Sequence, residues 1–306
     1  MPSLSAILIK KVLAVVTPRL KQKNIATTRK TQNQLGRIAS WLAGRRVAAT
    51  PQQLEHCSAA LIRVKANADQ RQILFYLHGG AYTAGGLNYA QGMGRRLASK
   101  LHLDVFCLAY RLAPENPFPA ALDDALAGYQ QLLQMGYAPE EITLIGESAG
   151  GGLLYALSLL LRQKGMAQPK AIIALSPWVD LLMRGASYQQ NQSRDPSLNE
   201  QKLHEDAAMY AAGHLEDPLV SPLYGQLSGT PRSLIICGGD ELLLDDAKLL
   251  ANKLSQDGCE AELLIEEYMW HAYVLYPTAE SAKAIARIAA FLGIEPRQAL
   301  TGQATP

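Results

Sequence analysis

The chain has 306 residues, of which 48% are apolar and 18% are charged, and its formal net charge is +2 at pH 7. This length and apolar content are enough to bury a core in one large or two ordinary domains, which excludes disordered and fibrous proteins. The small net charge creates no strong field around the whole protein, so we expect no nucleic-acid partner.

The first 54 residues are strongly basic. They contain ten Lys and Arg residues and no Asp or Glu, so the rest of the chain carries a net charge of about −8. Such a segment resembles an organellar transit peptide in composition. Alternatively, helices at 7–16 and 35–42 cover a pocket with their apolar sides and turn Lys and Arg toward water or an anionic lipid surface. The third interpretation is a solvated helical surface.

Apolar runs of strand length then alternate with helical stretches, a pattern that predicts a mostly parallel sheet covered by helices on both faces. The expected strands are 59–65, 72–77, 105–109, 142–145, 171–175, 233–237 and 261–265. The expected helices are 120–135, 149–164, 245–256 and 278–291.

Residues from about 181 to 225 interrupt this alternation. The stretch is polar, rich in Asn and Gln, and bounded by SPWVDL and DPLVSPLYG. Because a long excursion inside a compact domain is usually functional, we expect a lid over the ends of the strands. An ordinary surface loop is the alternative.

The four cysteines, at 57, 107, 237 and 259, form no CxxC pair and no short-spaced metal pattern. Two of them lie in apolar runs, where free cysteine behaves as a small hydrophobe. The most apolar helical run, 151–161, is shorter than the roughly 20 residues that span a bilayer, and a secretory signal is poorly matched. We therefore expect a reduced, soluble, cytoplasmic protein.

The sequence Gly146-Glu147-Ser148-Ala149-Gly150 fits the pattern G-x-S-x-G and lies between an expected strand and an expected helix. A sharp turn there exposes the serine Oγ at the carboxyl end of the sheet, and the flanking residues must be small because backbones pass closely. The unpaired amides that open the helix favour developing negative charge. This context predicts Ser148 as a nucleophile rather than a chance match.

A glycine pair, Gly79 and Gly80, follows His78 at the end of the expected strand 72–77. Consecutive glycines let the backbone approach a ligand and point N–H groups into a cleft, as stabilising an oxyanion requires. The pair could form only a turn. Its place between an early strand and Ser148 is nevertheless where an oxyanion loop should fall.

A serine nucleophile needs a base and an orienting acid, which in this kind of sheet follow in the order Ser, Asp or Glu, His. Asp240 and His271 each follow an expected strand, which predicts that both lie at the same sheet edge as Ser148. The other histidines precede strands, belong to the glycine loop or fall in the excursion. The acid is less distinct, because Glu241, Asp245 and Asp246 share its loop; Asp240 is the expected one.

Several linked motifs between residues 70 and 292 resemble the hormone-sensitive lipase family of α/β-hydrolases, the bacterial family IV carboxylesterases. They are HGG at 78–80, YRLAPENPFPAALDDA at 110–125, GESAGG at 146–151, SPWVDL at 176–181, DPLVSPL at 217–223, GGDELLLDDA at 238–247, and His271. The resemblance implies an α/β-hydrolase fold with a helical cap. It also implies Ser148 as nucleophile with Asp240 and His271, and an oxyanion hole made by the amides of Gly79, Gly80 and Ala149.

The resemblance also implies a domain division, because the family commonly uses the N-terminal region as a cap. We expect residues 1–50 to form the N-terminal cap segment and 181–225 a cap insertion. Residues 51–180 and 226–306 then form the hydrolase core.

Two residues depart from the family pattern, Ala81 at a usual third glycine and Ala272 at the usual glycine after the histidine. A Cβ at 81 disfavours positive φ and narrows the space for the alcohol part of a substrate. Arg111 and Glu115 of YRLAPE are interpreted as groups that fix a loop. The aromatic residues near the motifs are interpreted as core or pocket lining: Tyr82, Trp178, Trp270 and Tyr273.

The expected function is that of a carboxylesterase for short to medium acyl esters, acting through an acyl-enzyme without cofactor or metal. A lactonase, a deacetylase and a small-amide hydrolase use the same chemistry. A non-catalytic receptor of the same fold is less expected, since such receptors lack the triad histidine and His271 is present. Besides the ester, the partners considered are a lipid surface at the basic N-terminal segment and a second copy of the chain.

Overall fold

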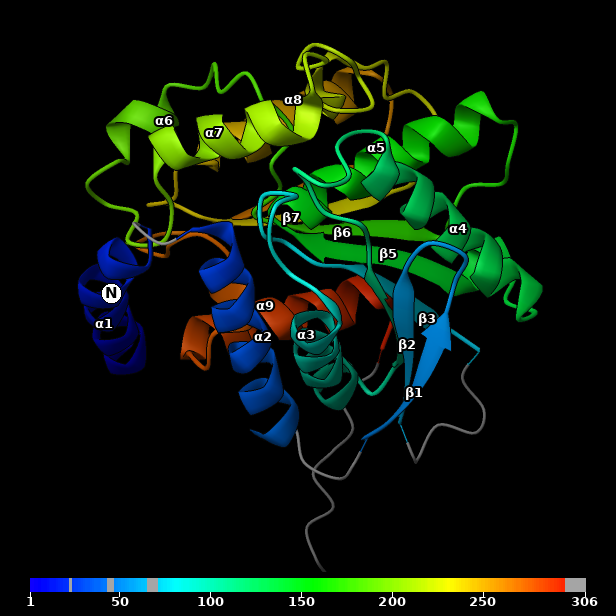
Figure 1. Ribbon diagram of the computed structural model, residues 1–306, viewed down its shortest axis with the longest axis horizontal. Coiled ribbons are helices and arrows are strands. Elements are labelled where there is room, and N and C mark those ends of the chain that lie inside the picture. The colour runs from blue at the N-terminus through cyan, green and yellow to red at the C-terminus, as the bar shows by residue number, and fades with distance from the viewer. Residues whose placement is uncertain (22–23, 43–46, 65–70, 295–306) are drawn as a thin grey trace, which may run out of the picture.

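The computed structural model describes residues 1–21, 24–42, 47–64 and 71–294. These residues form an eight-stranded sheet in the order β1-β2-β4-β3-β5-β6-β7-β8 (Figure 1). The strands are β1 (Val47–Gln53), β2 (Ser58–Val64), β3 (Ile73–Leu77), β4 (Asp104–Ala109), β5 (Ile142–Glu147), β6 (Ala171–Leu175), β7 (Ser233–Gly238) and β8 (Ala261–Glu266). β2 is antiparallel to both of its neighbours, and the other pairs are parallel. The predicted mostly parallel sheet is thereby confirmed.

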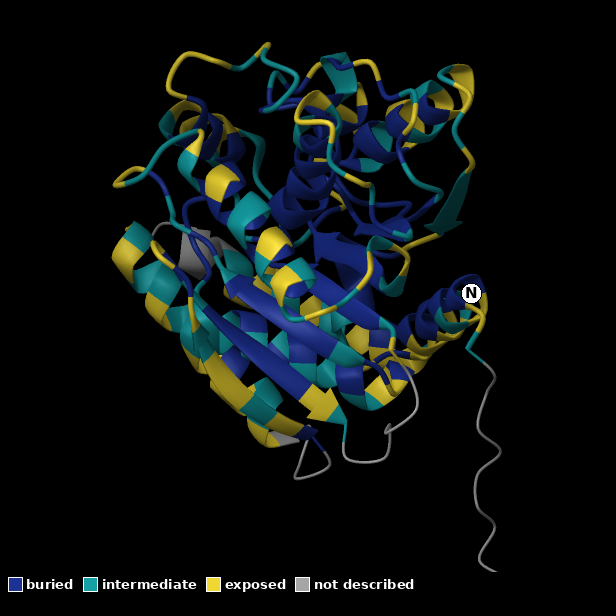
Figure 2. Cartoon of the chain, turned by 90° about the vertical axis from the view of Figure 1, so that its right-hand side faces the viewer, coloured by how far each residue is buried: buried dark blue, intermediate teal, exposed yellow. Residues whose placement is uncertain are grey.

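Helices cover both faces of the sheet (Figure 1). α4 (Ala120–Gln134), α5 (Ala149–Gln163) and α8 (Leu244–Gln256) pack on one face, and α3 (Leu87–Leu101) and α9 (Ala279–Leu292) on the other. Side chains of a strand alternate between the faces, so Phe75 of β3 packs with α4 and α5 whereas Leu74 and Tyr76 pack with α3 and α9. The inner strands are buried on both faces, as Figure 2 shows, which explains their continuous apolar sequences.

The remaining helices flank the carboxyl edge of the sheet. α1 (Leu4–Lys21) and α2 (Ile25–Leu42) precede β1, and α6 (Ser187–Gln190) and α7 (Glu200–Ala211) lie between β6 and β7. Three short 3₁₀ turns complete the described elements, η2 (Pro139–Glu141), η3 (Pro222–Tyr224) and η4 (Tyr273–Leu275). None of the helices within the described ranges is long and apolar enough to cross a membrane. The four cysteines are free thiols.

α2 is fixed to α3 by a close crossing of two glycines. A Cβ added at Gly36 would lie 2.2 Å from the carbonyl oxygen of Asn88, and one added at Gly92 would lie 2.4 Å from the carbonyl oxygen of Gly36. The side chain of Arg29 adds a polar anchor, because it donates to the carbonyl oxygens of Thr83 and Ala113 at 2.8 Å each. The second N-terminal helix is therefore packed on α3 and on the loops that follow β3 and β4.

The expected strands and core helices agree with the observed ones to within two residues at each end. Four of the helices and strands had no predicted range: β1, α3, α6 and α7. β1 is an exposed, polar edge strand that contains Pro51, so it lacks the apolar pattern of a buried strand. β1 starts at Val47 and pairs with β2, so residues 47–50 of the expected N-terminal cap segment lie in the sheet.

Candidate active site

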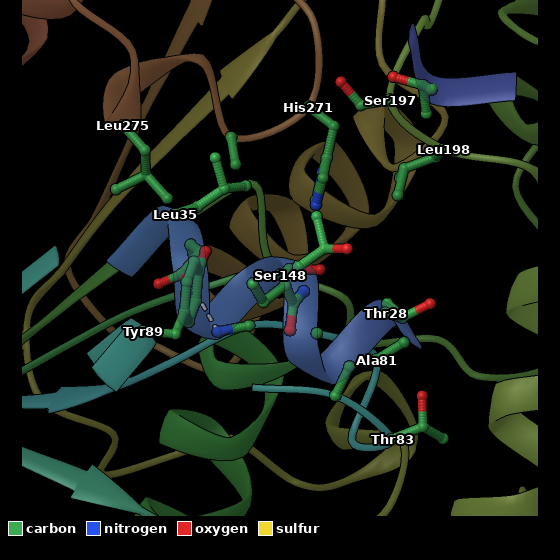
Figure 3. Close-up of a pocket in the computed structure, with 18 of the residues that line it drawn as sticks. Thr28, Leu35, Ala81, Thr83, Tyr89, Ser148, Ser197, Leu198, His271 and Leu275 are labelled. Carbon is green, nitrogen blue, oxygen red and sulfur yellow. Dashed lines mark hydrogen bonds between the residues drawn. The ribbon is translucent and has the colours of Figure 1, made fainter. Parts of the chain in front are cut away.

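The loops that follow β3, β5, β7 and β8 meet at the carboxyl edge of the sheet, as expected for ligand sites in such folds. The loops after β3, β5 and β8 border a pocket of about 500 Å³, a size typical of small-molecule sites. Other walls come from α1, α2 and the segment between β6 and β7. Figure 3 shows Ser148 and His271 reaching into this pocket, with Ala81 and Leu35 nearby.

Ser148 occupies the sharp turn that the sequence predicts between β5 and α5. Its backbone has φ 56° and ψ −124°, a strained conformation for a residue with a Cβ. The flanking glycines make the turn possible: a Cβ at Gly146 or Gly150 would lie 2.6 or 2.1 Å from the carbonyl oxygen of Leu77. Ser148 is therefore held at the N-terminal end of α5 with its side chain in the pocket.

His271 is paired with Glu241. The His271 Nδ1 atom lies 3.1 Å from Glu241 Oε2, and Glu241 Oε1 accepts a 3.1 Å hydrogen bond from the amide of Gly238. Glu241 is completely buried. An ionised carboxylate only accepts hydrogen bonds, so Nδ1 carries the proton and Nε2 keeps a lone pair for proton transfer.

The environment of His271 favours its charged form. Burial lowers the pKa of the imidazole, but the hydrogen bond and negative charge of Glu241, with smaller contributions from Asp195 and Glu147, outweigh burial and raise the pKa above 6.5. The imidazole is therefore a stronger base than an ordinary histidine side chain.

The structure does not bring Asp240, the expected acid, to His271. The carboxylate of Asp240 pairs with Lys10 and Arg194, not with His271. The two neighbouring acids point different ways from the loop after β7, and that direction cannot be read from their order in the sequence. Asp245 and Asp246 are engaged elsewhere, because Asp245 accepts from the amide of Ser187 and Asp246 from the amides of Val179 and Asp180.

One of the three expected oxyanion donors, the amide of Gly79, has a partner in the structure. The amide of Gly79 donates a 2.7 Å hydrogen bond to Glu147 Oε1, so it is not free to bind an oxyanion. Among the described residues, the amides of Gly80, Ala81 and Ala149 donate no hydrogen bond. Ala149 follows Ser148 in the chain, and Gly80 and Ala81 line the same pocket as Ser148. All three amides are therefore candidate oxyanion donors.

Glu147 is a structural residue that the sequence analysis missed. It is buried, accepts from Gly79 and from the Tyr89 hydroxyl at 3.1 Å, and burial raises its pKa to about 7. Glu147 occupies the variable position before the serine in G-x-S-x-G. A glutamate at the end of a strand can equally be a surface residue, so its position in the sequence did not indicate this role. Its hydrogen bond positions the glycine loop beside Ser148.

His78 does not compete for the role of base. It is buried, stacks on Tyr110 with ring centroids 4.2 Å apart, and its Nδ1 lies 2.8 Å from the carbonyl oxygen of Gly79. Burial lowers its pKa to about 4. A Cβ at Gly85 would lie 2.1 Å from the His78 ring, so the histidine fills the space beneath the glycine loop.

The two groups of YRLAPE fix loops, in agreement with the interpretation from the sequence. Arg111 forms a bidentate pair with Asp124, and Glu115 is held by Arg29 of α2. The four aromatic residues that flank the motifs are buried and do not border the pocket: Tyr82, Trp178, Trp270 and Tyr273. Tyr82 stacks on Tyr210, with ring centroids 3.6 Å apart.

Both departures from the family pattern lie in the left-handed region, with φ 52° at Ala81 and φ 54° at Ala272. The Ala272 amide donates a 3.0 Å hydrogen bond to Ser176 Oγ, which helps to hold this conformation beside His271. Ala81 borders the pocket. Its methyl group therefore adds both backbone strain and bulk where a glycine would add neither.

We expect Ala81→Gly to improve hydrolysis of esters of bulky alcohols. Removing the Cβ relieves crowding, and overpacking of this kind costs at least about 1 kcal/mol, or about fivefold in rate. The measurement is kcat/KM for acetate esters of primary, secondary and tertiary alcohols on both proteins. If the variant gains nothing on the tertiary ester relative to the primary one, Ala81 does not shape the alcohol pocket.

Comparison with known proteins places the chain in a family. Residues 74–275 match the family described as the alpha/beta hydrolase fold. The chain is 38% identical over 244 residues to an acetyl-hydrolase of Streptomyces hygroscopicus, covering 78% of this chain and 80% of that one. It is 35% identical over 232 residues to an esterase of Acinetobacter venetianus, covering 74% and 77%.

Solved structures agree. An esterase/lipase from an uncultured bacterium superposes with a TM-score of 0.88 at 30% identity, covering 95% of this chain and 98% of that one. An esterase from the bacterial hormone-sensitive lipase family gives a TM-score of 0.82 at 35% identity, covering 92% and 96%. The chain therefore belongs to the α/β-hydrolase family. Within it, the chain is a member of the bacterial hormone-sensitive lipase group, family IV.

Proposed function

We propose that Ser148, His271 and Glu241 form the triad with which this carboxylesterase hydrolyses short to medium acyl esters. One observation carries the proposal: His271 is oriented by the buried Glu241 carboxylate and shares a pocket with a serine held on a strained turn. A serine, a base and an acid in this relation are the parts that acyl transfer requires.

In the first half-reaction, Ser148 Oγ attacks the ester carbonyl carbon while His271 Nε2 takes the serine proton. The carbonyl oxygen becomes an oxyanion, which the amides of Gly80, Ala81 and Ala149 stabilise at the positive end of α5. His271 then gives its proton to the alcohol oxygen as the carbon–oxygen bond breaks. The alcohol leaves and the acyl group remains on Ser148.

In the second half-reaction, water attacks the acyl carbon. His271 accepts a proton from the water, the same amides stabilise the second oxyanion, and the proton passes to Ser148 Oγ as the acid product leaves. Glu241 stabilises the imidazolium in both halves and keeps Nδ1 protonated, so that Nε2 always faces the reaction.

This mechanism predicts an acid limb in the pH profile. kcat/KM for a neutral ester should fall as the pH drops through the pKa of His271, because the base acts only when deprotonated. Since Glu241 raises that pKa, the midpoint should lie above 6.5. In Glu241→Gln the charge is lost while burial remains, so the midpoint should move down. A flat profile from about pH 5 to 8 would exclude His271 as the base.

We infer that α1, α2 and the segment from about 181 to 225 form a cap over the pocket. Leu13 of α1, Leu35 and Ile38 of α2, and Leu198 line one continuous apolar space with Ser148. Acyl chains longer than this space have to displace packed side chains, at a typical cost of about 1 to 3 kcal/mol.

The experiment for the acyl preference is a series of p-nitrophenyl esters. kcat/KM should be highest between about two and eight acyl carbons and fall at least tenfold by sixteen. The similarity to a protein named acetyl-hydrolase supports the short end of this range. A preference that rises steadily with chain length would contradict a pocket of limited length.

Contact with an anionic lipid surface remains a prediction from the sequence. The outer sides of α1 and α2 expose large apolar residues, among them Leu8, Val12 and Trp41 at 64%, 52% and 79%. Lys11, Lys30 and Arg37 lie exposed on the same helices. A homodimer and a cytoplasmic location likewise stay predictions.

A further inference from the structure

We propose that Asp240 is a positioning residue. It fixes the positions of two pocket walls, α1 and the segment between α6 and α7, and thereby selects esters by size. It joins Lys10 of α1 and Arg194 of the segment between α6 and α7, and we call this trio the Asp240 latch. This inference rests on the proposed function, because it requires that the ester bind in this pocket. Asp240 is not part of the proposed triad, whose acid is Glu241.

On one side the latch holds α1. Lys10 Nζ lies 2.5 Å from Asp240 Oδ2 and donates a 3.0 Å hydrogen bond to the carbonyl oxygen of Tyr268. The Lys10 and Asp240 side chains are 27% and 7% exposed, so this pair is less accessible than an ordinary surface ion pair. The same helix contributes Leu13 and Thr17 to the pocket, one and two turns beyond Lys10.

On the other side the latch holds the segment after α6. Arg194 pairs with Asp240 Oδ1, and a second Arg194 nitrogen donates to Asn191 Oδ1 at 3.2 Å. Asn191 in turn donates from Nδ2 to the carbonyl oxygen of Glu241 at 2.9 Å. Ser197 and Leu198, three and four residues after Arg194, border the pocket.

Other contacts also hold α1, since Ile9 and Leu13 pack against the apolar cluster formed with α3 and α9. Its first turn is tied by Ser3, which hydrogen-bonds Glu280 through its amide at 2.6 Å and its hydroxyl at 2.8 Å. Ala6 is buried on the inner side of α1, whereas Leu8 and Val12 face outward and are more than half exposed. The pair between Lys10 and Asp240 adds to these contacts a polar link between the middle of α1 and the loop after β7.

One carboxylate thus connects two pocket walls that are about 180 residues apart in the sequence. Replacing it leaves Ser148, His271 and Glu241 in place, because the Asp240 backbone is held separately by a 2.9 Å hydrogen bond to the carbonyl oxygen of Met269. When the latch is broken, the walls relax outward. Short esters then lose contact with Leu13 and Leu198, and longer esters gain space.

The test is a mutant cycle of Lys10→Met, Arg194→Met and Asp240→Asn, assayed with p-nitrophenyl acetate and octanoate. For each variant we expect a KM for acetate that rises about fivefold, a kcat within about threefold of wild type, and an octanoate-to-acetate ratio of kcat/KM that rises at least fivefold. In the Lys10→Met/Arg194→Met background, adding Asp240→Asn should change the ratio no further, because its partners are already gone.

Arg184→Met is the matched control, since it removes an ion pair with Glu216 in the same excursion whose side chains are 58% and 77% exposed. It should leave the ratio unchanged. A loss in kcat with an unchanged ratio would overturn the proposal and assign Asp240 to the reaction itself. The proposal would also be overturned if Lys10→Met and Arg194→Met both folded and kept wild-type kinetics. Loss of the triad mechanism shows separately, as hydrolysis that persists in Ser148→Ala.

Discussion

Ser148→Ala should abolish ester hydrolysis, with kcat reduced on the order of 10⁶-fold, because removal of a triad nucleophile typically costs this much. The fold should be unaffected, since alanine is smaller than serine and fits the narrow turn between Gly146 and Gly150. The measurement is kcat for p-nitrophenyl butyrate, with circular dichroism and thermal unfolding as checks of the fold.

The companion variant is His271→Ala, which should be nearly as inactive as Ser148→Ala. The double variant should be no slower than Ser148→Ala alone, because nucleophile and base act as one unit and their losses do not add. If Ser148→Ala kept a tenth of the wild-type rate, the serine would have no part in the mechanism.

Glu241→Gln should reduce kcat on the order of 10⁴-fold, the loss typical of a neutral amide in place of the triad acid. The glutamine has the size of the glutamate but lacks its charge, so it no longer stabilises the imidazolium or keeps Nδ1 protonated. The measurement is kcat for p-nitrophenyl acetate at the pH optimum of each protein.

Asp240→Asn is the matched neighbour, since it removes one carboxylate from the same loop with an equally small change in shape. We expect its kcat to stay within about threefold of wild type, because the Asp240 side chain does not contact His271. The reverse ranking of the two variants would return the role of acid to Asp240.

The sheet and the serine turn could be predicted because their physics is local. A strand buried on both faces needs a continuous apolar run, and the turn around Ser148 needs glycine at 146 and 150. His271 could be placed for a related reason, since the carboxyl ends of parallel strands meet at one edge. These inferences depend only on where along the chain a residue lies.

The acid and the oxyanion donors could not be predicted fully, because they depend on the direction of individual groups. Asp240 and Glu241 are adjacent, yet one carboxylate turns toward α1 and the other toward His271. Gly79 and Gly80 are adjacent as well, yet the amide of Gly79 donates to the buried Glu147 at the end of β5, whereas the amide of Gly80 has no such partner. Such choices are set by tertiary contacts.

β1 was missed for a different reason. It is an edge strand whose pattern is polar and half exposed, so it has no apolar signature, and its strand conformation depends on pairing with β2. α2 begins at Ile25, ahead of its predicted start at 35, because residues 25–34 are mostly polar and give no apolar helical signal.

The most direct test of the account is to identify the residue that forms the covalent intermediate. A diethyl p-nitrophenyl phosphate should be attacked by Ser148 Oγ with loss of p-nitrophenolate, leaving a stable diethylphosphoryl serine. The account predicts one phosphoryl group per chain by intact mass, located on Ser148 by peptide mass spectrometry, with complete loss of esterase activity and no labelling of Ser148→Ala. Inactivation with the label on any other residue would contradict it.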